Sequence, residues 1–236
     1  MTRGQDMTEQ KSLIIINPNA SQSVTDSIDN TVQPLRRFGI PIRCLTLAEG
    51  PLGIESQKQA DLTIAPMLSL AERQTDAAGY VIACFGDPGL HALRDQTPLP
   101  VVGIQEAAVT TALNLGQRFG VIAIMPNSIP RHLRAFGAMG VLDRLAGDRA
   151  LGLGVADLAD RDNSLNAIIA TGLRLRDEDG ANVLIMGCAG MAHYRNVLED
   201  ATGLPVVEPC QAAVSLTLGQ ITLNLNHKSG NKIHAG

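Results

Sequence analysis

The chain has 236 residues and a formal net charge of −4, with 45% hydrophobic and 18% charged residues. This composition supports a sizeable buried core, and the weakly acidic balance without a basic stripe argues against nucleic acid as a partner. No apolar run reaches the ~18–20 residues of a membrane span, and the polar start MTRGQDMTEQK lacks the apolar segment of a signal peptide. We therefore expect a cytoplasmic protein that does not bind a membrane.

Short apolar runs alternate with longer helix-compatible stretches along the chain. The apolar runs predict strands at 12–16, 41–47, 80–84, 100–104, 120–125, 150–155, 183–188 and 205–208. Helices are expected between them, at 22–38, 55–78, 89–95, 105–117, 128–139, 162–177, 190–201 and 211–225. Such alternation is typical of α/β proteins, in which helices cover both faces of parallel sheets.

Three segments of the first half recur in the same order in the second half. The pairs are IIINPN at 14–19 with IAIMPN at 122–127, VIACFG at 81–86 with IMGCAG at 185–190, and LPVVGIQEAAV at 99–109 with LPVVEPCQAAV at 204–214. Because the offsets agree within four residues, we predict duplication of a whole small domain. The expected architecture is two pseudo-symmetric α/β domains with the active site in the cleft between them. The first domain spans residues 1–116, and the chain is able to return to it from the second domain. The second domain spans residues 117–236, with a C-terminal helix and a polar tail.

A cysteine ends an apolar run in each half, at Cys84 and Cys188. One such cysteine is typically a small buried hydrophobe, but two at matching positions favour a shared function. Ligands of parallel sheets bind outside the carboxyl ends of the strands, so the two thiols are expected to face one cleft. Cys44 has no counterpart in the repeat and is expected to be structural, and Cys210 is left without a role.

Facing thiols suit proton transfer at a carbon beside a carbonyl. One Cys as thiolate removes the proton, and the other as thiol returns one to the opposite face, which gives racemisation or epimerisation. Helix N-terminal N–H groups can lower a thiol pKa. The developing oxyanion also needs hydrogen-bond donors, and the candidates are the backbone N–H groups of the turn residues Phe85, Gly86, Ala189 and Gly190. No Cys or His pair has zinc-ligand spacing, and no lysine suits a Schiff base, so neither a metal site nor a Schiff-base cofactor is expected.

Several polar residues near the strand ends have simpler roles. Asp87 is expected to cap the helix that follows it, with Pro88 at the first helical position. Glu106 and Glu208 are suited to helix N-termini. His193 is expected to be a surface residue.

Six separated motifs resemble the hydantoin racemase branch of the aspartate/glutamate racemase superfamily. They are NPNAS (17–21), GPLGIES (50–56), ACFGDPGL (83–90), PVVGIQEAA (100–108), GCAGMA (187–192), and PVV (205–207) followed by AAV (212–214). The resemblance implies two pseudo-symmetric α/β domains, no cofactor, a homo-oligomer, and Cys84 and Cys188 as the acid–base pair. It also implies a substrate site lined by Asn17, Pro18, Phe85, Gly86, Met125, Ala189 and Gly190.

The residues after each thiol indicate the substrate. Aspartate and glutamate racemases of this superfamily carry an Asn-Thr and a Thr-Glu pair there, whereas this chain has Phe85-Gly86 and Ala189-Gly190. A neutral ring suits these turns better than a zwitterion, so the favoured substrate is a 5-substituted hydantoin or the ureide allantoin. The chain departs from the family pattern at two places. Gln105 stands in place of a glycine that is common in the family, and EPC at 208–210 is unlike the usual segment.

Two other functions stay open at this point. Amino-acid racemisation or maleate-type isomerisation would need cationic or hydroxyl partners near Cys84, and Ser21 and Ser128 could supply hydroxyls. A non-catalytic small-molecule binding protein with two α/β lobes is the remote alternative.

Overall fold

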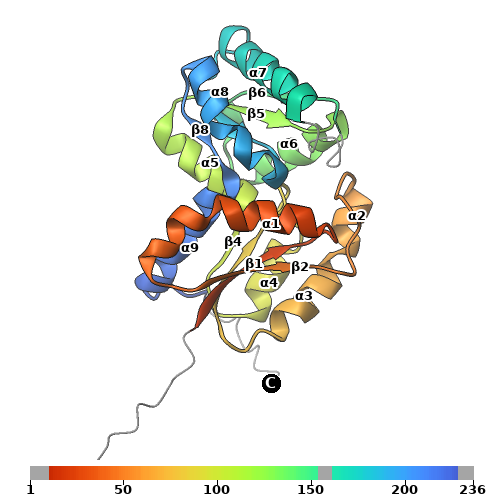
Figure 1. Ribbon diagram of the computed structural model, residues 1–236, viewed down its shortest axis with the longest axis vertical. Coiled ribbons are helices and arrows are strands. Elements are labelled where there is room, and N and C mark those ends of the chain that lie inside the picture. Colours follow the sequence, from red (N-terminus) through yellow and green to blue (C-terminus); the bar gives the residue numbers. More distant parts are fainter. Residues whose placement is uncertain (1–10, 154–160, 228–236) are drawn as a thin grey trace, which may run out of the picture.

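A computed structural model describes residues 11–153 and 161–227, which form two α/β lobes stacked along the long axis of the molecule (Figure 1). The first lobe contains a parallel sheet of order β2-β1-β3-β4, and the second a parallel sheet of order β6-β5-β7-β8. The strands are β1 (Ser12–Asn17), β2 (Ile42–Thr46), β3 (Ala77–Ile82), β4 (Val101–Gly103), β5 (Phe119–Ala123), β6 (Leu145–Ala150), β7 (Val183–Met186) and β8 (Val206–Val207). The shared strand order confirms two pseudo-symmetric α/β lobes.

The central strands are buried on both faces, as parallel sheets require. Every residue of β1, β5 and β7 is buried, so these strands read as continuous apolar runs. In both sheets the strand order reverses around the first strand of the lobe, which places the carboxyl ends of β1 and β3, and of β5 and β7, side by side. Such a reversal is where α/β sheets bind ligands.

One predicted strand is shifted. The sequence predicted a strand at 150–155, but β6 covers Leu145–Ala150, and 154–155 lie outside the described residues. β6 is an edge strand paired only with β5, and all its residues are partly exposed. It contains Asp148, which pairs with His132, and Arg149, which pairs with Asp179, and it lacks the apolar run by which the other strands were found.

Two helices predicted in the first lobe are broken. The expected helix 22–38 divides into α1 (Gln22–Thr31) and a 3₁₀ helix, η1 (Gln33–Phe38), because Pro34 has no N–H to continue the ladder. The expected helix 55–78 divides into α2 (Gln57–Leu62) and α3 (Ile64–Glu72), with Pro66 in the first turn of α3. The last two residues of the expected range, 77 and 78, belong to β3. α4 (Leu90–Gln96) lies where a helix was expected.

The second lobe follows the prediction more closely. α6 (Ile129–Ala138) follows a short 3₁₀ turn, η2 (Pro126–Ser128), and α7 (Arg161–Asp177) matches the predicted 162–177. The expected helix 190–201 begins as a 3₁₀ helix, η5 (Ala189–Tyr194), and continues as α8 (Arg195–Thr202).

Two helices cross between the lobes. α5 (Ile104–Leu115) follows β4 of the first sheet but packs against β5, β7 and β8 of the second. α9 (Pro209–Thr222) follows β8 of the second sheet but packs against β3 and β4 of the first, and the two helices also pack against each other. Figure 1 shows α5 beside the second sheet and α9 beside the first.

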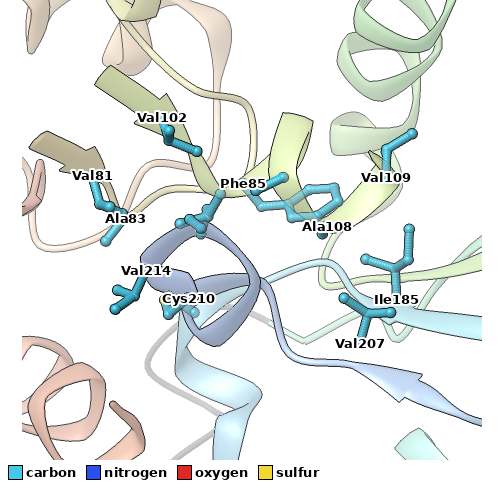
Figure 2. Close-up of a cluster of buried hydrophobic side chains, with 14 of the residues drawn as sticks. Val81, Ala83, Phe85, Val102, Ala108, Val109, Ile185, Val207, Cys210 and Val214 are labelled. Atoms are coloured by element: carbon cyan, nitrogen blue, oxygen red, sulfur yellow. The ribbon is translucent and has the colours of Figure 1, made fainter. Parts of the chain in front are cut away.

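The largest buried cluster runs through this crossing. It joins side chains of the first sheet, such as Val81 and Val102, to those of the second, such as Ile185 and Val207, through α5 and α9 (Figure 2). The two lobes thus share one core. Within the described residues, no helix is long and apolar enough to cross a membrane.

Candidate active site

Cys84 and Cys188 occupy matching places in the two lobes. Each lies two residues beyond the end of its strand, β3 for Cys84 and β7 for Cys188. The intervening residues extend the ladders in the same way, because Ala83 N–H donates to Ile16 at 2.8 Å and Gly187 N–H donates to Ile122 at 2.9 Å. Adding a Cβ at Gly187 would bring it within 2.7 Å of the Ile122 carbonyl oxygen, so only glycine permits this approach.

Both thiols line one cavity, as the paired motifs predicted. The cavity is narrow, at about 30 Å³, and takes its walls from both lobes. Its lining consists of Asn19, Val24, Ile54, Ala83, Cys84, Phe85, Ile124, Ser128, Arg131, Gly187, Cys188, Ala189 and Gly190. Five of the nine sequence-predicted site residues are therefore brought together: Cys84, Phe85, Cys188, Ala189 and Gly190.

The other four predicted site residues lie beside this lining rather than in it. Asn17 is buried, and its Nδ2 donates to Asn19 Oδ1 at 2.9 Å and to Thr25 Oγ1 at 3.0 Å, so it positions Asn19, which does reach the cavity. Pro18 lies against the loop that begins at Gly50, where an added Cβ would be 2.5 Å from the Pro18 carbonyl oxygen. Gly86 is an exposed residue at φ +134°, and Met125 packs against the apolar cluster of the second lobe.

Burial opposes ionisation of both thiols. It raises the pKa of Cys84 to about 12, assisted by Cys188 and Asp87 and opposed by the Arg131 guanidinium. Burial likewise raises the pKa of Cys188 to about 11, although the Gly190 N–H, which donates to its Sγ at 3.4 Å, pulls the pKa down. The expected lowering by a helix N-terminus is therefore present only at Cys188, and desolvation outweighs it. In the free protein both thiols are protonated at neutral pH.

The capping role predicted for Asp87 is wrong in its choice of helix. Its Oδ1 and Oδ2 each accept a backbone N–H, from Gln105 and Glu106, both at 2.9 Å, so Asp87 caps α5 instead of α4. Its φ of +46° turns the carboxylate away from α4, whose N-cap is Gly89. The carboxylate rests on Gly103, where an added Cβ would lie 2.1 Å from its Cγ.

A buried carboxylate also caps the pseudo-equivalent helix α9. Glu208 accepts the N–H groups of Cys210 and Gln211 at 3.1 and 2.6 Å, as expected of an acid at a helix N-terminus. Burial raises the pKa of each capping carboxyl, Asp87 and Glu208, to about 7. Each capping carboxylate also raises the pKa of the thiol in its own half of the chain: Asp87 raises that of Cys84, and Glu208 raises that of Cys188.

Sequence reasoning missed two residues on α6. Arg131 lines the cavity and His132 lies under Phe85, with ring centroids 5.0 Å apart in an edge-to-face contact. His132 Nδ1 is 2.8 Å from Asp148 Oδ2, and both side chains are almost fully buried. Ser128, Arg131 and His132 recur at the spacing of one helix face just after a strand end, and this pattern could have revealed them.

The remaining cysteines lie outside the lining. Cys44 is partly buried in β2 against the shared core, and Cys210 is fully buried in the first turn of α9. His193 is exposed, as expected. Among residues 11–153 and 161–227, no three His, Cys, Asp or Glu side chains come together as a metal site.

Solved structures with the same fold define the class of protein. The chain superposes on allantoin racemase from Klebsiella pneumoniae with a TM-score of 0.88 and 28% identity, over 92% of this chain and 90% of that chain. Allantoin racemase from Pseudomonas fluorescens gives a TM-score of 0.88 and 27% identity, over 92% and 93% of the two chains. The protein is an isomerase of the racemase class.

The sequence comparisons narrow the class to a family. The family model described as Asp/Glu/Hydantoin racemase matches residues 13–217. The hydantoin racemase of Paenarthrobacter aurescens is 32% identical over 224 residues, which cover 93% of this chain and 94% of that relative. The chain belongs to the Asp/Glu/hydantoin racemase family, which confirms the resemblance read from its motifs.

Proposed function

We propose that the protein racemises 5-substituted hydantoins, or the related ureide allantoin, by two-base proton transfer between Cys84 and Cys188 without a cofactor. The observation that carries the proposal is the placement of both thiols, from matching strand ends of two lobes, in the wall of one cavity. The relatives described as hydantoin and allantoin racemases support this substrate class.

In the proposed reaction, the thiolate of one cysteine takes the proton from C5 of the ring. The C–H bonding pair moves into the adjacent carbonyl to form an enolate, and the other thiol then gives its proton to the opposite face of C5. The thiolate has thereby moved from one cysteine to the other, and the return reaction restores it. Of the turn N–H groups predicted as donors to the enolate oxygen, those of Phe85 and Ala189 remain candidates, because Gly86 lies outside the cavity lining and the Gly190 N–H donates to Cys188 Sγ. One such donor typically contributes about 3–4 kcal/mol to lowering the barrier.

Because both thiols are protonated in the free protein, one of them has to lose a proton before turnover. Each thiol has a neighbour that favours its thiolate, the Gly190 N–H at Cys188 and the Arg131 guanidinium at Cys84, so either is able to serve as the first base.

Single enantiomers in D2O test the proposal. The wild-type protein should racemise an L- or D-5-substituted hydantoin and place deuterium at C5. Cys84→Ala and Cys188→Ala should each abolish racemisation, while exchange of one enantiomer without inversion is compatible with a single remaining base. Cys44→Ala, which removes a thiol outside the cavity, is the matched control and should racemise normally. Undiminished racemisation by both active-site variants would refute the two-thiol mechanism.

A carboxylate substrate is the second candidate, because such a substrate needs a cation or hydroxyl groups near Cys84 and the cavity lining contains both. Arg131 and Ser128 both line the cavity with Cys84. Parallel assays of aspartate, glutamate and maleate separate this candidate from the hydantoins: turnover of one of these acids with none of hydantoins or allantoin would replace the favoured proposal.

A further inference from the structure

Among the residues that the structure describes, Arg131 is a cation without a carboxylate partner in the wall of the active-site cavity. It lies on α6, and one terminal nitrogen of its guanidinium donates to Ser128 Oγ at 3.2 Å. Within residues 11–153 and 161–227, the Nε of Arg131 is buried without a hydrogen-bond partner. In the same residues, the Arg131 side chain takes part in none of the ion pairs. In that part of the chain, Arg36 and Arg195 also have a buried Nε without a partner, but each binds a carboxylate through a terminal nitrogen, Asp29 for Arg36 and Glu199 for Arg195.

A buried guanidinium donor that lacks an acceptor is unfavourable unless another molecule supplies one. Burial lowers the pKa of Arg131, but an arginine side chain keeps its positive charge at neutral pH. Among the ionisable groups that line the cavity, Cys84 acts electrostatically on Arg131, but its thiol is neutral in the free protein and offers no negative charge. The missing group is therefore an anionic oxygen that enters the cavity on the side of α6.

We infer that Arg131 binds a carboxylate on the C5 substituent of the substrate, so that the preferred hydantoins are those of acidic amino acids. The inference rests on the proposed function and names its substrate class. The ring lies between the two thiols, its substituent extends toward α6, and the Ser128 hydroxyl holds the guanidinium in place. A fixed positive charge in the resting site suits a group that is negative throughout the reaction, whereas the enolate oxygen is negative only transiently and has backbone N–H candidates of its own.

Two substrates of nearly equal shape test this inference. 5-(Carboxymethyl)hydantoin and its neutral amide, 5-(carbamoylmethyl)hydantoin, differ in the charge of the substituent. The wild-type protein should show a higher kcat/KM for the carboxylate, by a factor on the order of 10 to 100, as expected for a hydrogen bond between charged groups. Arg131→Gln should remove this preference mainly by raising KM for the carboxylate, and Arg131→Lys should retain part of it.

Arg134→Gln is the matched control. Arg134 lies on the same helix, is exposed, and donates to the exposed Gln57 at 2.7 Å outside the cavity lining. It tests whether charge anywhere on α6 is sufficient, and it should leave the preference for the carboxylate unchanged.

The outcomes distinguish the two proposals. Racemisation of neither compound, nor of any other hydantoin or allantoin, refutes the proposed function. Racemisation of the amide with equal or lower kcat/KM for the carboxylate overturns the role of Arg131 and leaves the proposed function standing. An unchanged ratio of the two kcat/KM values in Arg131→Gln also overturns it, because Arg131 would then act on the reaction through Cys84 alone and not on the substituent. If this variant does not fold, the wild-type comparison of the two substrates still decides.

Discussion

Cys84 and Cys188 combine two properties that rarely occur together in reactive cysteines. They line a cavity, yet burial keeps both of them protonated. Reactive cysteines are usually activated by a lowered pKa. Here the Arg131 guanidinium at Cys84 and the Gly190 N–H at Cys188 are the groups that favour the thiolate, and they counteract desolvation only in part. A site of this kind restricts thiolate formation in the free protein, which limits its reaction with oxidants and electrophiles.

Alkylation rates should reveal the raised thiol pKa values. The rate at which iodoacetamide modifies Cys84 and Cys188, resolved by peptide mass spectrometry, should keep rising beyond pH ~9, where a free cysteine of pKa ~8.5 is already largely ionised. Both residues should behave in this way, since burial raises the pKa of Cys188 to about 11 and that of Cys84 to about 12. Free cysteine is the control, and a plateau at pH 8.5 or below for either residue would contradict the role given to burial.

At the scale of elements, the sequence predicted what burial dictates. Strands β1, β3, β5 and β7 were found because each contains a short apolar run, and the edge strand β6 was displaced because its polar residues broke that pattern. The helix breaks in the first lobe follow from Pro34 and Pro66, whose missing N–H was visible in the sequence. The helix that Asp87 caps was not predictable in this way, since the choice depends on the φ of one loop residue and on the absence of a Cβ at Gly103.

The cap of α9 should make stability depend on pH. Glu208 is 3% exposed, and its pKa rises from 4.5 to about 7 on folding. The folded state therefore holds this proton more tightly than the unfolded state, and the resulting stabilisation is complete below pH ~4.5 and is lost as the pH rises through 7. Glu208→Gln cannot lose that proton. Relative to wild type, its free energy of unfolding should be higher at pH 7.5 than at pH 5 by on the order of 2–3 kcal/mol.

Urea unfolding at the two pH values measures this difference. Glu72→Gln makes the same chemical change at an exposed position of α3 and should shift the free energy of unfolding equally at both pH values. If the effect of Glu208→Gln on the free energy of unfolding changed between the two pH values no more than that of Glu72→Gln, the Glu208 carboxyl would titrate alike in the folded and unfolded states, contrary to the prediction.

For the whole molecule, the exchanged helices determine what the sequence could and could not establish. The repeat predicted two pseudo-symmetric lobes and the place of both thiols at strand ends. It did not reveal that α5 covers the second sheet and α9 the first, because each helix is apolar on a face that would suit either sheet. The spacing of Arg131 and His132 could have marked them as one helix face, but their approach to Cys84 and Phe85 depends on how one lobe meets the other, which no pattern within a lobe shows. The division of the chain at 116/117 stays a prediction.

The shared core should make the two lobes unfold together. The chain has two tyrosines and no tryptophan, with Tyr80 in β3 of the first lobe and Tyr194 in η5 of the second. Tyr194→Phe leaves a fluorescence probe only in the first lobe, and Tyr80→Phe leaves one only in the second. Within each variant, the urea midpoint from tyrosine fluorescence should coincide with that from far-UV circular dichroism, as a two-state transition requires.

Each variant serves as its own reference, because Tyr80→Phe removes the hydrogen bond from its hydroxyl to the Ala71 carbonyl oxygen and so lowers the midpoint of both signals alike. Separate midpoints, with the fluorescence of one lobe changing before the overall helix content, would mean that the lobes are stable independently. The crossing of α5 and α9 argues against that outcome: unfolding either lobe alone would expose the apolar face of a helix supplied by the other, together with the part of the sheet beneath it.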